Sequence, residues 1–357
     1  MSADGYSGRA ESGSGADAVT PGKAAAVEAT YPISIHVAAS DGYVLGGFIW
    51  GGSDDKSSRR PVVIVNPATS VRCRYYFKFA QFLHEHGFIV VAFDYRGIGE
   101  SRPASLRNFD ATYTDWGRLD FEAILVYVAN RFPGQSIDVA AHSIGGFLLG
   151  LAPSNNLIRR VFTMGAQYAY WKDFAPNRRL LMVLKWFVFM PIVTKLFGYF
   201  PGSRFGWIED TPKGVVKQWS MFSRSFENPV WKATKRSGEH SPLPFGETFG
   251  SLQAPILAMS VTDDEWGTSS AINRLLGHFE NCRKYHLRIP PAAINEPAIG
   301  HFAFFQKRYE PTLWPIPLAW LQSGTMPALF SPYLEREQRA ATDVSPTDDE
   351  LKTPAPL

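Results

Sequence analysis

Cysteine is scarce in this chain of 357 residues, in which Cys73 and Cys282 are the only two. Two thiols cannot form the disulfide framework of a small secreted domain, and these two do not form a C-x-x-C pair. The sequence also lacks an H-E-x-x-H motif or a comparable spacing of metal ligands. We therefore expect two free, packed thiols, and we expect neither a metal nor another cofactor.

A strong excess of charge of either sign is missing as well. The chain has 36 Lys and Arg against 33 Asp and Glu, a formal net charge of +3, and the basic residues are spread along it. Because nucleic-acid binding needs a concentrated basic surface, we expect a small-molecule substrate and no nucleic-acid partner. With 45% hydrophobic residues, the chain can bury one large core or two modest ones.

Uninterrupted apolar runs of about 20 residues, which a membrane-spanning helix needs, are absent from the sequence. The strongest candidate, Leu180 to Val193, is interrupted by Lys185 and Pro191, so we expect a buried or lid helix and no transmembrane segment. Residues 1–30 are rich in Gly, Ala and Ser without the apolar centre of a signal peptide, and predict a disordered leader. Residues 335–357 are polar and contain proline, and predict a disordered tail. The default expectation is a cytoplasmic protein.

Short buried strands alternate with helices along most of the chain, which predicts an α/β fold with a mainly parallel sheet after an antiparallel hairpin. Between residues 165 and 250 helical spacing and aromatic residues dominate, which indicates a helical insertion into a core formed by residues 31–164 and 251–323. Strands are expected at 33–37, 43–50, 61–65, 88–93, 137–141, 160–164, 255–260 and 285–289, and helices at 74–86, 116–131, 271–279 and 312–321.

One stretch in this pattern stands out as a candidate site. The apolar run Ile137 to Ala141 ends abruptly in His142-Ser143-Ile144-Gly145-Gly146, and a helix-compatible run follows. A serine on a tight strand-to-helix turn has its hydroxyl pushed out from the backbone, and such a turn needs small residues two positions to either side. Ala141 and Gly145 meet that need, so Ser143 is the candidate nucleophile.

The order of elements and two motifs resemble the α/β-hydrolase superfamily over about Tyr31 to Ser323. One motif is the Ser143 turn, although the superfamily's G-x-S-x-G has a glycine where this chain has Ala141. The other is Asp94-Tyr95-Arg96-Gly97-Ile98-Gly99-Glu100-Ser101, similar to the D-Y-R-G-I-G-x-S of predicted serine hydrolases in the superfamily. The resemblance implies an α/β-hydrolase fold in which residues 165–250 form a helical cap inserted after the sixth strand.

In this superfamily a serine, an acid and a histidine follow one another along the chain, each after a sheet strand. Here His301 comes after the strand at 285–289 and is the expected general base. The resemblance puts the acid at Asp263, with Asp264 and then Glu265 as alternatives. His142 is expected to pack against the turn and to take no part in the chemistry.

The resemblance also implies an oxyanion hole made of two backbone N–H groups. The first would be that of Ile144, directly after the serine. The second would come from the loop Asn66-Pro67-Ala68-Thr69, where the superfamily often has His-Gly; because Pro67 has no N–H, we expect Ala68 as the donor and Thr69 as the alternative.

The loop that begins at Asp94 invites two other interpretations. Asp94 and Arg96 could act as a second carboxylate or an anion clamp, but within this fold a structural buttress beside the site is the better expectation. Gly97-Ile98-Gly99 lacks the third glycine and the helix start of a dinucleotide fingerprint, which argues against a nucleotide cofactor.

These residues predict an enzyme without a cofactor: a serine hydrolase that cleaves an ester or thioester through an acyl-enzyme. The aromatic residues of the cap indicate an apolar acyl or aryl substrate, although most of these rings are expected to pack the cap against the core. They are Tyr168, Tyr170, Trp171, Phe174, Trp186, Phe187 and Phe189. Acyl transfer or C–C bond hydrolysis on the same three residues, and a non-catalytic binding protein on the hydrolase fold, stay open as alternatives.

Overall fold

The structure, a computed structural model, describes residues 31–52, 59–222 and 245–341. The predicted leader at 1–30 and the last part of the predicted tail, 342–357, lie outside these ranges. Residues 31–341 belong to a single compact unit.

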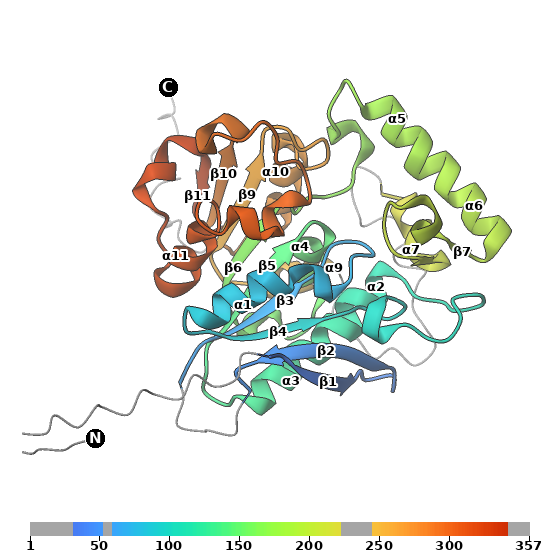
Figure 1. The fold of residues 1–357 in the computed structure, drawn as a ribbon, viewed down its shortest axis with the longest axis horizontal. Coiled ribbons are helices and arrows are strands. Elements are labelled where there is room, and N and C mark those ends of the chain that lie inside the picture. The colour runs from blue at the N-terminus through green and yellow to red at the C-terminus, as the bar shows by residue number, and fades with distance from the viewer. Residues whose placement is uncertain (1–30, 53–58, 223–244, 342–357) are drawn as a thin grey trace, which may run out of the picture. The chain divides into compact units, whose positions relative to one another are not determined.

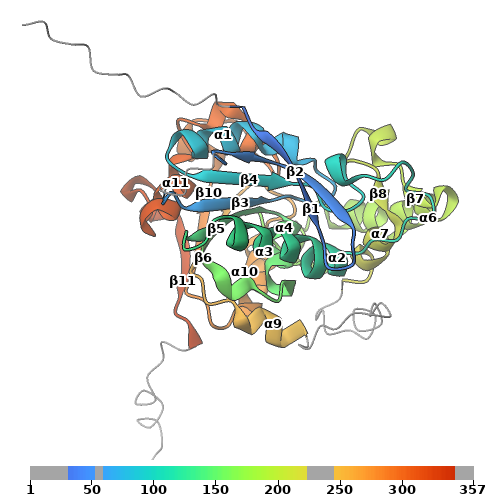
Figure 2. The same ribbon diagram turned by 90° about the horizontal axis from the view of Figure 1, so that it is seen from below.

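A nine-stranded sheet runs through this unit in the order β1-β2-β4-β3-β5-β6-β9-β10-β11 (Figures 1 and 2). The five pairs from β4 to β10 are parallel, and the pairs β1–β2, β2–β4 and β10–β11 are antiparallel. The prediction of a mainly parallel sheet that follows an antiparallel hairpin is therefore confirmed. The strands are β1 (Ile33–Ala38), β2 (Val44–Trp50), β3 (Val62–Asn66), β4 (Ile89–Phe93), β5 (Ile137–His142), β6 (Ile158–Met164), β9 (Ile256–Val261), β10 (Lys284–Ile289) and β11 (Leu334–Gln338).

Both faces of the central strands are covered by helices, which explains their unbroken Val and Ile content. On β3, Val62 and Ile64 face one apolar cluster and Val63 and Val65 face the other. The first cluster takes in α3 (Glu122–Arg131), α4 (Ile144–Leu148) and α10 (Ser269–His278), and the second takes in α1 (Phe77–Glu85) and α11 (Pro315–Ser323). The expected helix at 116–131 is α3 preceded by a π-helical stretch, Trp116–Phe121, and by α2 (Tyr113–Asp115).

Between β6 and β9, where the sequence predicts a helical insertion, residues 165–222 of the described chain are mainly helical, and residues 223–244 lie outside the described ranges. Its main feature is one continuous 19-residue helix, Arg179–Phe197, made of α5 (Arg179–Val183), a π-helical stretch (Leu184–Phe189) and α6 (Met190–Phe197). A two-stranded sheet, β7 (Tyr199–Phe200) and β8 (Thr211–Pro212), and α7 (Lys213–Trp219) follow. We call residues 165–222 the cap. Figure 1 shows its helices α5, α6 and α7, in yellow-green and yellow, grouped to one side of the sheet.

Two predicted boundaries need correction. The insertion was expected to reach residue 250, but α9 (Phe245–Ser251) packs back on the core, where the Phe249 ring lies 5.4 Å from that of Phe147 and 5.1 Å from that of Phe279. The tail was expected to begin at residue 335, yet β11 pairs with β10 along the sheet edge. Hydrogen bonding to an edge strand can order a polar segment that has few apolar residues to bury, and a hydropathy pattern does not register it.

Candidate active site

The turn at Ser143 has the geometry of a strained strand-to-helix elbow. Ser143 lies between β5 and α4 with φ +53°, a backbone conformation that non-glycine residues rarely adopt. A Cβ at Gly145 would lie 2.5 Å from the Asn66 carbonyl oxygen, so only glycine fits there. Ala141, at the position where the superfamily has its other glycine, is buried in the core and is accommodated.

His301 follows the tenth strand in the loop where the sequence places it, and it lines one pocket together with Ser143. Within the described part of the chain the Ser143 hydroxyl makes no hydrogen bond, so in this structure the two side chains line one pocket without a hydrogen bond between them. Hydrogen bonds of this kind are often long before substrate binds.

The carboxylate that contacts His301 is that of Asp264. Its Oδ2 lies 2.7 Å from His301 Nδ1, and Asp264 is 2% exposed. The structure thus brings the alternative, Asp264, to the His301 ring in place of the expected Asp263. Asp263 Oδ2 instead accepts hydrogen bonds from the backbone N–H groups of Ile299 and Gly300, at 2.8 and 3.0 Å, and so holds the loop that carries His301.

The surroundings of Asp264 favour its charged form. Burial alone would raise the pKa of this carboxyl, but the His301 ring and the backbone N–H groups of Gly267 and Trp266 outweigh it and hold the pKa below its usual value. Only glycine fits at position 267, because a Cβ there would lie 2.5 Å from Asp264 Oδ2. A glycine three residues after an acidic pair is the one signal in the sequence that favours Asp264.

The two backbone N–H groups predicted as oxyanion donors differ in whether they are free to bind a substrate. Ile144 is the first residue of α4, so its N–H has no partner within that helix. Ala68 lines the pocket, but its N–H already donates to the Tyr76 hydroxyl at 2.9 Å, so the expectation for Ala68 is wrong. Thr69, the alternative, also lines the pocket, and among the described residues its N–H has no hydrogen-bond acceptor. The sequence could not show that the backbone N–H of Ala68 would donate to the hydroxyl of a tyrosine eight residues away.

A buried hydrogen-bonded chain that the sequence did not predict connects the two sides of the site. It runs from Ala68 N–H to the Tyr76 hydroxyl, to His142 Nδ1 at 2.9 Å, and from His142 Nε2 to the His301 carbonyl oxygen at 2.9 Å. A carbonyl only accepts, so Nε2 carries the proton and Nδ1 accepts from Tyr76. His142 therefore orients the His301 backbone, where we had expected only packing against the turn.

This arrangement requires a neutral His142. Burial, followed by the neighbouring His301, lowers the pKa of His142 to about 3. At neutral pH the ring is therefore uncharged and holds the single tautomer that the chain of hydrogen bonds needs.

The pocket over Ser143 has a volume of about 160 Å³ and a mostly aromatic lining. Cap and core both contribute: Trp186, Trp207 and Trp219 come from the cap, and Trp266 and Phe302 from core loops. The Trp186 ring lies 5.0 Å from that of Trp219 and 4.8 Å from that of Trp266. The lining residues are Ala68, Thr69, Ser143, Lys185, Trp186, Trp207, Ile208, Trp219, Trp266, His301 and Phe302.

Only part of the predicted aromatic lining is found. Of the seven aromatic residues singled out in the cap, Trp186 lines the pocket, whereas Tyr168 and Phe174 are buried in the core cluster. Lys185, which the sequence marked only as an interruption of an apolar run, also lines the pocket. Its Nζ lies 3.5 Å from the centre of the Trp207 ring, and burial lowers its pKa, an effect that Glu265 opposes.

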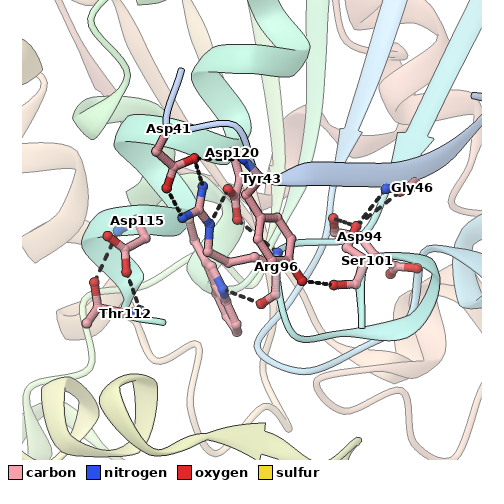
Figure 3. Close-up of polar contacts among 10 residues, drawn as sticks. Asp41, Tyr43, Gly46, Asp94, Arg96, Ser101, Thr112, Asp115 and Asp120 are labelled. Carbon is pink, nitrogen blue, oxygen red and sulfur yellow. Dashed lines mark hydrogen bonds and ion pairs between the residues drawn. The ribbon is translucent and has the colours of Figure 1, made fainter. Parts of the chain in front are cut away.

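The loop from Asp94 to Ser101 acts as the expected buttress (Figure 3). Arg96 is 1% exposed and is paired with Asp120 and Asp41, each at 2.6 Å, so its charge is already matched by two carboxylates. Asp94 accepts hydrogen bonds from the backbone N–H groups of Cys73 and Glu100, at 2.6 and 2.9 Å. Both side chains are therefore committed to holding the loop, which rules out an anion clamp.

Tyr95, from the same loop, reaches the site through Asn66. Its hydroxyl donates to Asn66 Oδ1 at 2.7 Å, and Asn66 Nδ2 donates to the Gly145 carbonyl oxygen at 2.8 Å. The buttress, the segment at Asn66 and the elbow are thus joined by side-chain hydrogen bonds.

Both cysteines are free and buried, as predicted. Burial raises the pKa of Cys282 to about 12 and that of Cys73 further, so neither thiol is activated. Among the described residues, no group of three His, Cys, Asp or Glu side chains is placed to hold a metal ion.

Comparison with known proteins agrees with the fold. A family model described as serine aminopeptidase, S33, matches residues 57–190. No curated protein sequence matches the chain. Among solved structures, a soluble variant of monoglyceride lipase from Saccharomyces cerevisiae, in complex with a substrate analogue, is similar with a TM-score of 0.59 and 14% identity, covering 84% of this chain and 97% of the lipase.

Two further structures show the range of the likeness. DcsB, in complex with its substrate analogue, has a TM-score of 0.55 and 11% identity, covering 83% of this chain and all of DcsB (100%). The alignment with the esterase Pf2001 from Pyrococcus furiosus covers 79% of this chain and 88% of the esterase, at 14% identity and with a TM-score of 0.49. Together, the sheet order and these likenesses show that the chain has the α/β-hydrolase fold, and its residues 57–190 are similar to the serine aminopeptidase, S33, family.

Proposed function

We propose that the protein is a serine hydrolase that cleaves an ester or thioester of an apolar acyl or aryl substrate through an acyl-enzyme. The observation that carries this proposal is the hydrogen bond of 2.7 Å between Asp264 and His301 beneath a pocket that Ser143 also lines. A serine hydroxyl needs such a base, oriented by a carboxylate, to become a nucleophile near neutral pH.

In the proposed reaction Ser143 Oγ attacks the substrate carbonyl carbon while His301 Nε2 takes the hydroxyl proton. Asp264 holds the ring through Nδ1 and stabilises the imidazolium that forms. The proton then passes from His301 to the leaving alcohol or thiol, and the acyl group stays on Ser143. Water, deprotonated by His301, attacks the acyl-enzyme and releases the acid.

The negative charge that develops on the carbonyl oxygen needs two N–H donors. We assign them to Ile144 and Thr69, because Ala68 N–H is already hydrogen-bonded to Tyr76. Backbone donors held in a dry site contribute strongly, and losing one typically costs about 10²–10³-fold in kcat.

The lining of the pocket supports an apolar acyl or aryl group. Four tryptophans and Phe302 surround the space in front of Ser143, and its small volume, about 160 Å³, favours short acyl chains or single aromatic rings in this conformation. Acyl transfer and C–C bond hydrolysis would use the same residues. We give hydrolysis of an ester or thioester priority because acyl transfer needs an acceptor other than water and C–C bond hydrolysis needs protonation of a carbon leaving group.

A fluorophosphonate probe tests the proposal, because it labels only a serine that a neighbouring base activates. Wild-type protein should be labelled and should release p-nitrophenol from p-nitrophenyl butyrate. Ser143→Ala should lose both signals, whereas Ser323→Ala, at an exposed serine on α11, should keep both. Failure of the wild type to be labelled, or undiminished labelling of Ser143→Ala, would overturn the proposal and favour a binding protein. Faster turnover with an added alcohol acceptor and no free acid would replace hydrolysis by acyl transfer.

A further inference from the structure

The long cap helix presents a continuous apolar face to solvent. Along Arg179–Phe197, Leu180, Leu184, Val188, Ile192 and Leu196 are exposed by 73%, 50%, 45%, 56% and 76%, and Leu181 by 58%. Five of these residues recur every four positions, so they form one ridge along the helix. Ordinary surfaces of globular proteins have scattered apolar side chains, whereas a ridge of this length indicates an interaction surface.

The opposite face of the same helix is packed into the protein. Met182, Trp186, Met190 and Val193 are buried, and all four belong to the main core cluster. By length and composition this helix could cross a membrane, and it is the one helix of the described residues that could. A helix that is anchored along one side and apolar along the other is instead suited to lie flat at an interface between water and lipid.

Charge along this segment has one sign. From residue 174 to residue 208 the sequence has no Asp or Glu but five cationic residues: Arg178, Arg179, Lys185, Lys195 and Arg204. Lys195 and Arg204 are exposed and make no ion pair within the part of the chain that the structure describes. The nearest acidic residues are already paired: Asp173 with Arg274, Glu209 with Arg72, and Asp210 with Arg102.

The apolar face is continuous with the rim of the candidate active site. Phe189, on the long helix, lies 5.4 Å from Phe205 and 5.7 Å from Trp207, measured between ring centres. The three rings are 38–40% exposed, and Trp207 also lines the pocket with Ser143. Half-exposed aromatic rings beside an apolar ridge suit the boundary between lipid headgroups and acyl chains.

From these observations we infer that the cap docks on an anionic lipid surface. The ridge from Leu180 to Leu196 enters the acyl boundary, the rings of Phe189, Phe205 and Trp207 lie at headgroup level, and Lys195 and Arg204 contact anionic headgroups. The pocket then opens beside the lipid, so that an apolar substrate can enter it without crossing water. Docking itself does not depend on the proposed hydrolase chemistry.

Charge decides against a second copy of the chain as the occupant. Two such faces brought together would oppose the exposed Lys195 and Arg204 of one copy with those of the other, and residues 174–208 offer no acidic residue to balance them. Like charges brought together across an interface cost several kcal/mol, whereas an anionic bilayer supplies both the apolar phase and the opposite charge.

Co-sedimentation with vesicles tests the inference on the full chain. Wild-type protein should sediment with vesicles of phosphatidylcholine and phosphatidylglycerol, more weakly with phosphatidylcholine alone, and less as salt is raised. Val188→Glu with Ile192→Glu should lower partitioning at least tenfold. Lys195→Glu with Arg204→Glu should remove most of the preference for anionic vesicles. Circular dichroism melting confirms that each variant is folded.

Two controls separate docking through the cap from non-specific apolar binding and from the hydrolase proposal. Leu157→Glu with Leu329→Glu removes two exposed apolar residues outside the cap, 44% and 76% exposed, and should leave partitioning unchanged. Ser143→Ala should bind vesicles as the wild type does, so that failure of the hydrolase proposal would not be mistaken for failure of docking. Absence of vesicle binding by the wild type, or equal binding by Val188→Glu/Ile192→Glu, would overturn the inference. A dimer that this double variant abolishes, without any vesicle binding, would assign the face to a second copy.

Discussion

At the level of single residues, two adjacent aspartates have different partners. Asp264 contacts the His301 ring, and Asp263 holds the backbone N–H groups of Ile299 and Gly300. The first contact fixes the orientation and tautomer of the proposed base, whereas the second holds the backbone of its loop. The two carboxylates therefore predict separable effects on the reaction.

Asp264→Asn should lower kcat by about 10³–10⁴-fold, because an amide cannot stabilise the imidazolium and favours the wrong tautomer. Asp263→Asn keeps a carbonyl oxygen that can accept from the loop, so its kcat should fall less than about tenfold by the same comparison. Steady-state hydrolysis of p-nitrophenyl butyrate measures both. Equal losses, or the reverse order, would return Asp263 to the role that the sequence first assigned to it.

Tyr76 is the centre of the buried hydrogen-bonded chain between Ala68 and His142. Tyr76→Phe leaves the Ala68 N–H and His142 Nδ1 without their partner, and buried groups left unsatisfied cost about 1–3 kcal/mol. We expect that loss in the free energy of unfolding, measured by urea titration. Tyr127→Phe, at a partly buried ring on α3, should lower the free energy of unfolding by less than about 0.5 kcal/mol, as substitutions outside the core usually do. A Tyr76→Phe protein as stable as the wild type would contradict this chain of contacts.

The low pKa of His142 also predicts a dependence of stability on pH. The pKa of His142 is about 3 in the folded protein against 6.5 for an ordinary histidine. Between these two pH values His142 is therefore protonated in the unfolded chain and neutral in the folded protein. The free energy of unfolding should therefore fall as pH drops from 6.5 toward 3, by at most about 1.4 kcal/mol per pH unit from this group. His142→Gln removes the titration, and the difference in unfolding free energy between wild type and variant should shrink over that range. A difference that is independent of pH would show that His142 is protonated in the fold.

At the level of elements, the elbow depends on the close approach of α4 to the loop after β3. Gly145→Ala would place a Cβ 2.5 Å from a backbone oxygen of Asn66, which cannot move aside as a side chain could. We expect at least about a 100-fold loss of kcat/KM, because a shift of about 1 Å in a positioned group can cost that much.

Gly277 provides the matched control for this substitution. It lies in α10, and a Cβ there would meet nothing within 4 Å. Gly277→Ala should leave kcat/KM unchanged and stabilise the protein by about 0.5–1 kcal/mol through helix propensity. If both glycine variants kept full activity, the elbow would not depend on this contact.

At the level of the whole molecule, the pocket exists only where cap and core meet. Trp207 belongs to the cap, is 40% exposed and lines the pocket, so it can be truncated with little loss of core packing. Trp207→Ala should raise KM for aryl esters about five- to tenfold with kcat nearly unchanged, the pattern of lost uniform binding. Trp171→Ala, a cap tryptophan that is 37% exposed and does not line the pocket, should change neither constant. A fall in kcat alone for Trp207→Ala would place the cap in the chemical step instead.

Much of this protein could be read from local sequence patterns. The unbroken apolar runs of β3, β4 and β5 and the small residues around Ser143 come from constraints that act within a few residues, whereas His301 was expected from the resemblance to the superfamily's order of residues. Side-chain period, turn sterics and burial on both faces of a strand depend on neighbours along the chain, so the sequence by itself determined the fold class and the elbow.

Tertiary structure alone decided the contacts between residues far apart in the chain. Asp263 and Asp264 differ by one position, and only the path of the loop after β9 determines which one meets a histidine 37 residues away. The Ala68 N–H, expected as an oxyanion donor, is hydrogen-bonded to the Tyr76 hydroxyl. The apolar run at 180–193 is buried along one face and exposed to solvent along the other. Hydrogen-bond pairing and solvent exposure are properties of the packed chain, because each depends on which distant groups arrive at the same place.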